Sequence, residues 1–327
     1  MDGFVLFVLV LVLAAEFVNG WTDAPNSIAT VVSTRVLSPG QALVMASVLN
    51  ILGAMSGTAV AATIGKGIIK ADVVNIGTVA AAMVAIVFWS TLAWAYGLPT
   101  SESHALIAGL SGAGLATAGS DALIWDGWQK VLIGLLISTF LGFLGGLALT
   151  LAIYWSFRRQ RPGIVRRIFG RLQLLSAAFM AFSHGSNDGQ KFIGAFTLTL
   201  VLGGLLPRFE VPFWVILLCA GTMGVGTAVG GWRIVKTMGL GITKLDPVHG
   251  FAAETAAASA IEFASRLGIP VSTTHTINTS IMGVGATRRL SAVRWGVGSE
   301  IVTAWILTFP VCGLIAWLVT KMYLFFR

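Results

Sequence analysis

Two short polar stretches, residues 16–27 and 182–191, each follow a long apolar run of the sequence. Each contains the pattern Gly-x-x-Asp, which places Asp23 in the first stretch and Asp188 in the second. A carboxylate in such a segment is costly unless it is paired or faces a polar path, and residues of this kind commonly mark a route for ions or polar solutes. We therefore take these two stretches as the centre of the chain's chemistry.

The oxygen-bearing side chains of these stretches are suited to a small, hard cation. No lysine or arginine lies near Asp23 in the sequence, and an anion placed beside carboxylates would be repelled unless a cation accompanied it. The pattern predicts that an anion moves together with Na+ or H+. The residues expected to hold the coupling cation are Asp23, Asn26, Thr22 and Asp188. Alternatively, Asp23 caps a helix that begins at Ala24, with Pro25 in its first turn.

A second pair of polar blocks, residues 97–104 and 268–275, shares the pattern Gly-x-Pro-x-Ser-x-Ser/Thr-His. Each block leads into a short, glycine-rich apolar segment, which predicts a re-entrant hairpin with a broken helix. The N-terminus of such a helix offers N–H donors and a partial positive charge, and both suit an oxyanion. Helix capping would explain either block alone, but the duplication favours two N-termini that converge on one ligand.

The predicted anion-binding residues are the hydroxyls of these two blocks together with polar side chains of the second stretch. They are Ser101, Ser103, Ser272, Thr273, Thr274, Asn187, Gln190 and Lys191. Asn187 is also a candidate for the cation site. His104 and His275 are candidates for a proton relay, although a lone buried histidine is as often structural. Glu254 has no carboxylate counterpart in the first half of the chain and is a candidate protonation site.

The composition predicts an all-α polytopic membrane protein. Hydrophobic residues make up 56% of the 327 residues and charged residues only 10%, too few charges to cover a soluble surface of this size. Several continuous apolar runs reach the roughly 20 residues that one helical crossing needs. We expect about ten to twelve embedded helical segments, some of them broken. Cys219 and Cys312 lie in apolar segments and indicate neither a disulfide nor a metal site.

Matching blocks in the same order divide the chain into two repeats. We expect a first transmembrane repeat at 1–157, an arginine-rich loop at 158–171 and a second transmembrane repeat at 172–327. Loops at equivalent positions carry charges of opposite sign, since Asp121 and Asp126 lie where the second half has arginines. The positive-inside rule then predicts inverted repeats in a plasma (inner) membrane, with both termini outside and the loop cytoplasmic. The same rule accounts for the net charge of +8 without nucleic acid.

In combination, the blocks at 19–26, 57–60, 183–191 and 270–275 resemble the inorganic phosphate transporter (PiT) family over nearly the whole chain. The resemblance implies a secondary transporter of inorganic phosphate with inverted repeats, coupled to Na+ or H+. The bacterial branch is often coupled to H+ and carries a metal–phosphate complex.

The family pattern is Gly-x-Asn-Asp-x-x-Asn in each half, and this chain departs from it at Thr22 and Lys191. These departures argue against two intact Na+ sites, and Lys191 would replace a cation or contact the anion.

Other functions remain open at this point. A sulfate permease with the same fold would use the same hydroxyl and N–H donors. An ion channel or an intramembrane enzyme is disfavoured, because the chain has no Gly-x-Ser-x-Gly or His-Glu-x-x-His motif and two broken halves suit alternating access. We expect no cofactor besides the coupling ion. We also expect a lipid bilayer around the chain, and a homodimer is possible from the sequence.

Overall fold

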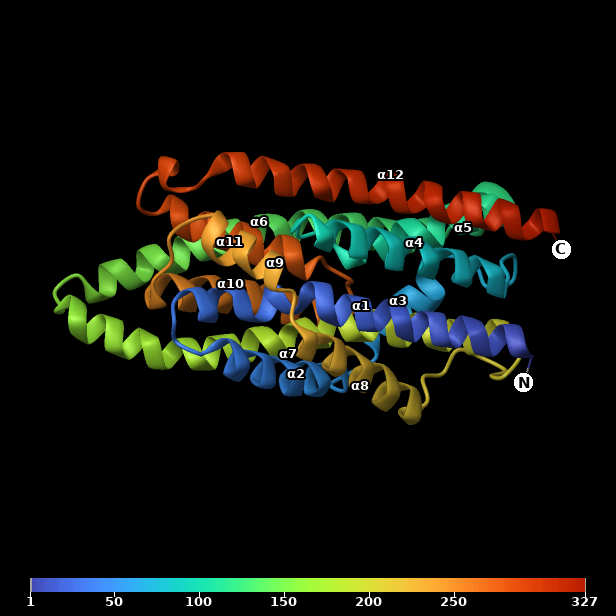
Figure 1. Ribbon diagram of the computed structural model, residues 1–327, viewed down its shortest axis with the longest axis horizontal. Helices are drawn as coiled ribbons and strands as arrows, with labels where there is room; N and C mark the ends of the chain where they lie inside the picture. The colour runs from blue at the N-terminus through green and yellow to red at the C-terminus, as the bar shows by residue number, and fades with distance from the viewer. Residues whose placement is uncertain (1, 327) are drawn as a thin grey trace.

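The computed structural model describes residues 2–326 and contains only helices and loops in that range, with no β-strand (Figure 1). The prediction of an all-α fold is confirmed. The first half, so far as it is described, contains α1 (Gly3–Ser33), α2 (Pro39–Ala54), α3 (Ala59–Gly67), α4 (Ile76–Ala95), α5 (Glu102–Ala118), η1 (Gly119–Ala122) and α6 (Trp125–Phe157). The second contains α7 (Pro162–Leu202), α8 (Phe213–Val229), α9 (Trp232–Lys236), η2 (Thr237–Gly241), α10 (Pro247–Arg266), α11 (Thr273–Ala286), η3 (Leu290–Ala292) and α12 (Trp295–Phe326).

Length and composition make several of these helices able to cross a membrane. Among the described residues, α1, α4, α6 and α12 are each long and apolar enough for one crossing. Two further pairs are long and apolar enough together but are bent, since α2 and α3 meet at 67° and α8 meets the α9–η2 segment at 61°. Each pair is either a broken crossing or a re-entrant loop. The apolar run from Ala42 to Ile64 is therefore not one helix, and the Gly57 block lies at the break between α2 and α3.

The two polar stretches lie inside continuous helices and not at helix ends. Asp23 is in the middle of α1, and Asp188 is in the middle of the 41-residue α7. The alternative that Asp23 caps a helix beginning at Ala24 is therefore wrong. Pro25 is tolerated inside α1, where its ring removes one N–H and leaves the carbonyl of Trp21 without its usual helical donor.

Both halves of the chain follow the same succession: a long helix with a polar stretch, a bent pair, a hairpin and a second long helix. Both termini lie at one end of the molecule, and the turn between α6 and α7 lies at the other (Figure 1). α1 begins at the terminal end, whereas α7 begins at the end with the turn. This arrangement supports the prediction of inverted repeats at 1–157 and 172–327, which stays a prediction.

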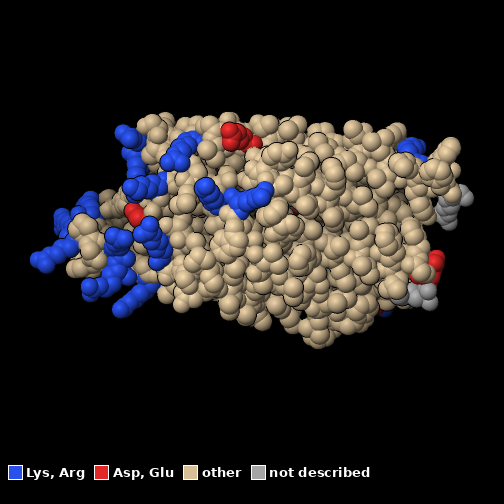
Figure 2. Space-filling model, viewed as in Figure 1, with Lys and Arg blue, Asp and Glu red and all other residues tan. Residues whose placement is uncertain are grey.

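Positive charge gathers at the end of the molecule that holds the α6–α7 turn (Figure 2). The broad flank between the two ends shows few charged side chains in this view. The exposed arginines of the turn and the start of α7 are Arg158, Arg159, Arg161, Arg166, Arg167 and Arg171. An apolar belt with basic residues at one end agrees with the predicted cytoplasmic position of the arginine-rich loop, which stays a prediction.

Glycines let neighbouring helices approach closely around the centre of the bundle. A Cβ atom on Gly53 of α2 would lie 2.0 Å from the Phe182 carbonyl oxygen of α7, and one on Gly185 would lie 2.1 Å from the Asn50 oxygen of α2. Gly226 of α8 makes the same kind of contact with the backbone of Phe17 in α1. Small residues at such crossings permit backbone contact between membrane helices.

We predict that Gly53→Ala destabilises the protein, because backbone atoms of α7 leave no space for the added methyl group. Overpacking of this kind costs about 1–3 kcal/mol, visible as a lower midpoint of thermal unfolding in detergent. Gly40→Ala is the matched control in the same helix, because a Cβ at Gly40 would meet no neighbouring atom within 4 Å. Equal midpoints for the two variants would contradict the close α2–α7 contact.

Candidate functional site

A polar stripe runs along one face of α1 through the middle of the bundle. Its members are spaced three and four residues apart, so they share one helix face. They are Glu16, Asn19, Asp23, Asn26 and Thr30, and all are buried. Buried polar groups of this kind need partners: Asn19 donates to Glu16, whereas α11 and α10 supply partners to Asp23, Asn26 and Thr30.

Asp188 of α7 is surrounded by donors. The ammonium group of Lys191, one turn further along α7, forms an ion pair with one carboxylate oxygen. Thr273 Oγ1 donates to the other oxygen at 2.7 Å, and His184 Nε2 lies 3.3 Å from it. The charge of Asp188 is thus compensated within the protein.

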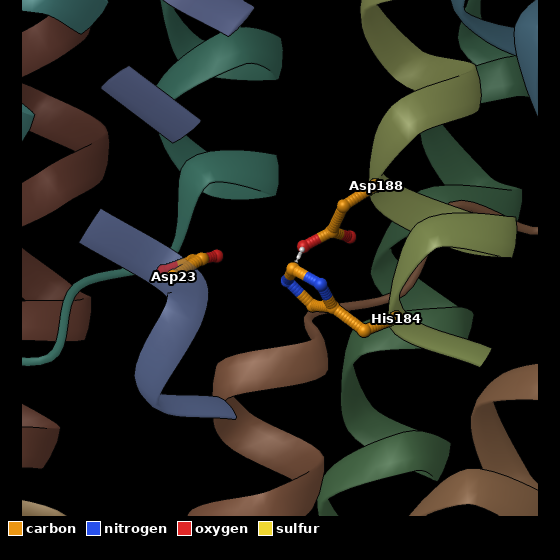
Figure 3. A group of neighbouring side chains, drawn as sticks. All are labelled: Asp23, His184 and Asp188. Atoms are coloured by element: carbon orange, nitrogen blue, oxygen red, sulfur yellow. Dashed lines mark ion pairs between the residues drawn. The ribbon is translucent and has the colours of Figure 1, made fainter. Parts of the chain in front are cut away.

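Asp23 faces Asp188 across the ring of His184 (Figure 3). One ligand atom from each of the three side chains lies within 4.8 Å of the other two, and all three residues are buried. Within residues 2–326, no lysine or arginine forms an ion pair with Asp23, whose carboxylate receives only long hydrogen bonds of 3.4 Å from Thr274. Carboxylate and imidazole groups in this arrangement are able to hold a cation or a metal ion.

The tips of the α4–α5 and α10–α11 hairpins meet at Lys191. Ser103, in the first turn of α5, donates to the carbonyl of Val271, which precedes α11, at 2.8 Å. Lys191 Nζ lies 2.5 Å from Ser103 Oγ and 2.8 Å from the Val271 oxygen. A single buried ammonium group therefore joins α7 to both hairpins.

The first turn of α11 links the two aspartates. Thr273 donates to Asp188 and Thr274 to Asp23, while Asn26 Nδ2 lies 3.3 Å and 3.0 Å from the two threonine hydroxyls. The structure thus brings residues of the predicted cation set and of the predicted anion set into one network.

Other predicted residues lie beside this network. Ser101 and Ser272 accept from the backbone N–H groups of His104 and His275, at 3.3 and 3.2 Å, and so cap α5 and α11. Asn187 accepts from the Val271 N–H at 3.2 Å and thereby holds the loop before α11.

Gln190 supports a different element. Its side-chain oxygen accepts from the Val60 N–H at 3.0 Å, at the start of α3. The structure places Gln190 against the broken α2–α3 pair, outside the contacts of Asp23 and Asp188.

The two histidines of the hairpins lie together. The rings of His104 and His275 are 4.4 Å apart in an edge-on arrangement, and His275 stacks on Trp305 of α12 at 3.6 Å. No ion pair joins either ring to a carboxylate in the described part of the chain.

Glu254 is at the centre of a separate buried cluster. Thr30 Oγ1 and Ser176 Oγ donate to it at 2.5 Å each, and Gln173 Nε2 donates at 3.1 Å. Glu254 thus ties α10 to α1 and α7, one helical turn beyond Asn26 along α1.

Two residues of the centre were not predicted from the sequence. Glu102, in the first turn of α5, is buried and accepts hydrogen bonds from Thr22 at 3.1 Å and Ser90 at 2.8 Å. It lies at the position that Thr273 holds in the second block, so the alignment of the two blocks contained the signal. His184 was also missed, although its spacing of four from Asp188 places both on one face of α7.

An apolar helix bundle with a buried charged centre, built where two long helices meet two hairpin tips, defines a membrane transporter. Comparison with known proteins narrows this class. Residues 19–316 match the phosphate transporter family, and so the chain belongs to that family. Family members are transporters and not enzymes, and the predicted resemblance is confirmed.

Named relatives agree with this assignment. A protein of Rhizobium meliloti called "probable low-affinity inorganic phosphate transporter" is 46% identical over 97% of both chains. A Bacillus subtilis protein with the same name is 38% identical, again over 97% of both chains. The fold is similar to a solved structure described as the sodium-dependent phosphate transporter, with a TM-score of 0.89, 25% identity, and coverage of 99% of this chain and 100% of that one.

We predict that Lys191→Met destabilises the protein strongly, because Asp188 would be left as a buried charge without its partner. Breaking a buried ion pair costs about 3–5 kcal/mol. The double variant Lys191→Met with Asp188→Asn removes both charges and should recover much of that loss. The measurement is the midpoint of thermal unfolding in detergent. A single variant as stable as the unaltered protein, or a double variant no better than the single one, would contradict the ion pair's role.

Proposed function

We propose that this protein is a symporter that imports inorganic phosphate together with Na+ or H+. The observation that carries the proposal is the meeting of both hairpin tips at Lys191, directly beside the Asp23–Asp188 pair. Donors for an anion and acceptors for a cation thus lie within one buried centre. A symporter needs this arrangement because it carries both charges in the same step.

The anion would bind between the hairpin tips. Ser103, Thr273 and Lys191 present donors there, and the first turns of α5 and α11 add backbone N–H groups with the partial positive charge of a helix start. In the described structure these donors are paired with the Val271 carbonyl and Asp188. Phosphate would therefore exchange these internal partners for its own oxygens, which makes its binding sensitive to the neighbouring carboxylates.

The cation would bind at Asp23. Asp188 already has the ammonium of Lys191, whereas Asp23 forms no ion pair with a lysine or arginine among the described residues and receives only long hydrogen bonds from Thr274. A doubly charged anion placed next to Asp23 is repelled unless Na+ or H+ neutralises the carboxylate. If a divalent metal accompanies phosphate, Asp23, His184 and Asp188 are the residues that would hold it.

Movement of the helices would give access to this centre from each side in turn. The charged groups of the centre are almost completely buried, with Asp23 4% exposed and Lys191 1% exposed. The bent pairs and the hairpins would rock against α1 and α7 around the fixed site. The basic end would face the cytoplasm and both termini would lie outside, in a plasma (inner) membrane.

Uptake of labelled phosphate into proteoliposomes tests the proposal. We expect accumulation that is driven by an imposed Na+ gradient or an imposed pH gradient, because only a coupled cation neutralises Asp23. Sulfate is added as a competitor, since it offers the same tetrahedral oxygens. Better accumulation of sulfate than of phosphate would assign the sulfate alternative, and flux that ignores both gradients would indicate a channel.

A matched pair of variants tests the place of coupling. Asp23→Asn keeps the size of the side chain but removes its charge. It should abolish the uptake that the Na+ gradient or the pH gradient drives in the unaltered protein. Asp121→Asn, at an exposed position in η1, should leave uptake unchanged. Retained coupled uptake in Asp23→Asn would reject Asp23 as the cation site.

The orientation has its own test. An epitope tag inserted at residues 158–161 should be reached by antibody only from the cytoplasmic face of the membrane, because the basic end is expected there. A tag at the N-terminus should be reached only from the outer face. A cytoplasmic N-terminus would overturn the proposed orientation.

A further inference from the structure

A pocket of about 590 Å³ opens at the basic end of the molecule. It lies between the C-terminal end of α1, the start of α7, the η2–α10 segment and the start of α12. Its lining includes Thr34, Arg35, Arg166, Lys244, Asp246 and Arg294. Four cationic side chains from four separate parts of the chain thus face one cavity (compare the basic end in Figure 2).

The charge of this pocket is not compensated from within. Among the described residues, none of the four cationic side chains of the pocket forms an ion pair. Asp246, the one acidic residue of the lining, pairs instead with Arg288 at 3.1 Å and His249 at 2.9 Å, which are not part of the lining. Arginine and lysine side chains grouped in this way are suited to a phosphate group.

Polar side chains connect the pocket to the buried centre. Thr34 Oγ1, at the pocket, donates to Gln173 at 2.9 Å, and Gln173 donates to Glu254. Thr30 also donates to Glu254, and lies one turn from Asn26, which contacts the threonines of the centre. These contacts form a polar line from the Asp23–Asp188 pair to the basic end, in which one helical turn of α1 separates Asn26 from Thr30.

We propose that this pocket is a second oxyanion site, which binds inorganic phosphate as it leaves the centre on the cytoplasmic side. The inference rests on the proposed function for the identity of the anion and for the direction of its movement. The Glu254 cluster lies between the two sites. While its hydrogen bonds hold α1, α7 and α10 together, the cluster blocks the passage of phosphate along the polar line. Phosphate in the cytoplasm would occupy the same pocket and slow further release.

Cysteine protection measures binding at the pocket itself. The native cysteines, Cys219 and Cys312, are buried, so Ser33→Cys at the pocket lining becomes the reactive thiol for a small, charged thiol reagent. The protein is placed in nanodiscs of phosphatidylcholine, and the rate of modification is measured against the concentration of inorganic phosphate. We expect phosphate to slow the reaction. Leu240→Cys lines the same pocket and provides a second position if Ser33→Cys folds poorly.

Charge variants then test the arginines. Arg35→Gln with Arg294→Gln should raise the phosphate concentration needed for half-protection by roughly tenfold, since charged hydrogen bonds are lost. Arg208→Gln is the control, because Arg208 is exposed and paired with Glu210 outside the pocket. Absence of protection, or equal protection in the double variant, would overturn the proposal.

An experiment with lipid distinguishes inorganic phosphate from the phosphate group of a lipid headgroup. Phosphatidic acid is added to the nanodiscs in the absence of inorganic phosphate. Protection by this lipid, with no further effect of inorganic phosphate, would make the pocket a lipid headgroup site and overturn the proposal. Phosphate uptake by the same variants is measured in parallel. Protection without any uptake would reject the proposed function but retain the oxyanion pocket, whereas uptake without protection would reject only the pocket.

Discussion

The ion pair between Lys191 and Asp188 is the interaction on which the centre of this structure depends. Two opposite charges are almost fully buried there, and each would be very costly alone. The same ammonium also holds Ser103 and the Val271 carbonyl, so its position fixes both hairpin tips relative to α7. Any ligand that binds between the tips must exchange contacts with this one charged group.

The two aspartates differ in their surroundings although their sequence motifs match. The ring of His184 lies between the two aspartates, but only Asp188 has an ammonium group beside it, whereas Asp23 receives long hydrogen bonds from Thr274 and has no lysine or arginine partner among the described residues. The proposed cation site at Asp23 rests on this difference. This asymmetry comes from Lys191, which occupies the position where the family pattern has asparagine.

The continuous helices and the broken helices have different structural roles. α1 and α7 run unbroken through the bundle and carry the charged groups in fixed register, which only Pro25 perturbs. The bent pairs and the hairpins pack against them through glycines, such as Gly53 and Gly226, at backbone contact distance. Close packing of this kind favours discrete arrangements over gradual deformation, which suits the proposed alternating access.

The sequence alone determined the class, the helical fold and the identity of most central residues. Few charges and long apolar runs can only be satisfied by membrane helices, and carboxylates such as Asp23 and Asp188 stand out because burying them has a high cost. The duplicated blocks also marked where α5 and α11 begin, whereas the re-entrant hairpins stay a prediction. What the sequence did not determine was which polar groups pair with each other, since those contacts join residues up to 251 positions apart. Only the tertiary structure could show that Lys191 neutralises Asp188, that Gln190 turns instead to α3, and that Glu102 and His184 belong to the centre. The continuity of α1 past Pro25 was likewise visible only in the tertiary structure, because a proline is tolerated inside a membrane helix when its surroundings permit, and the sequence does not show those surroundings.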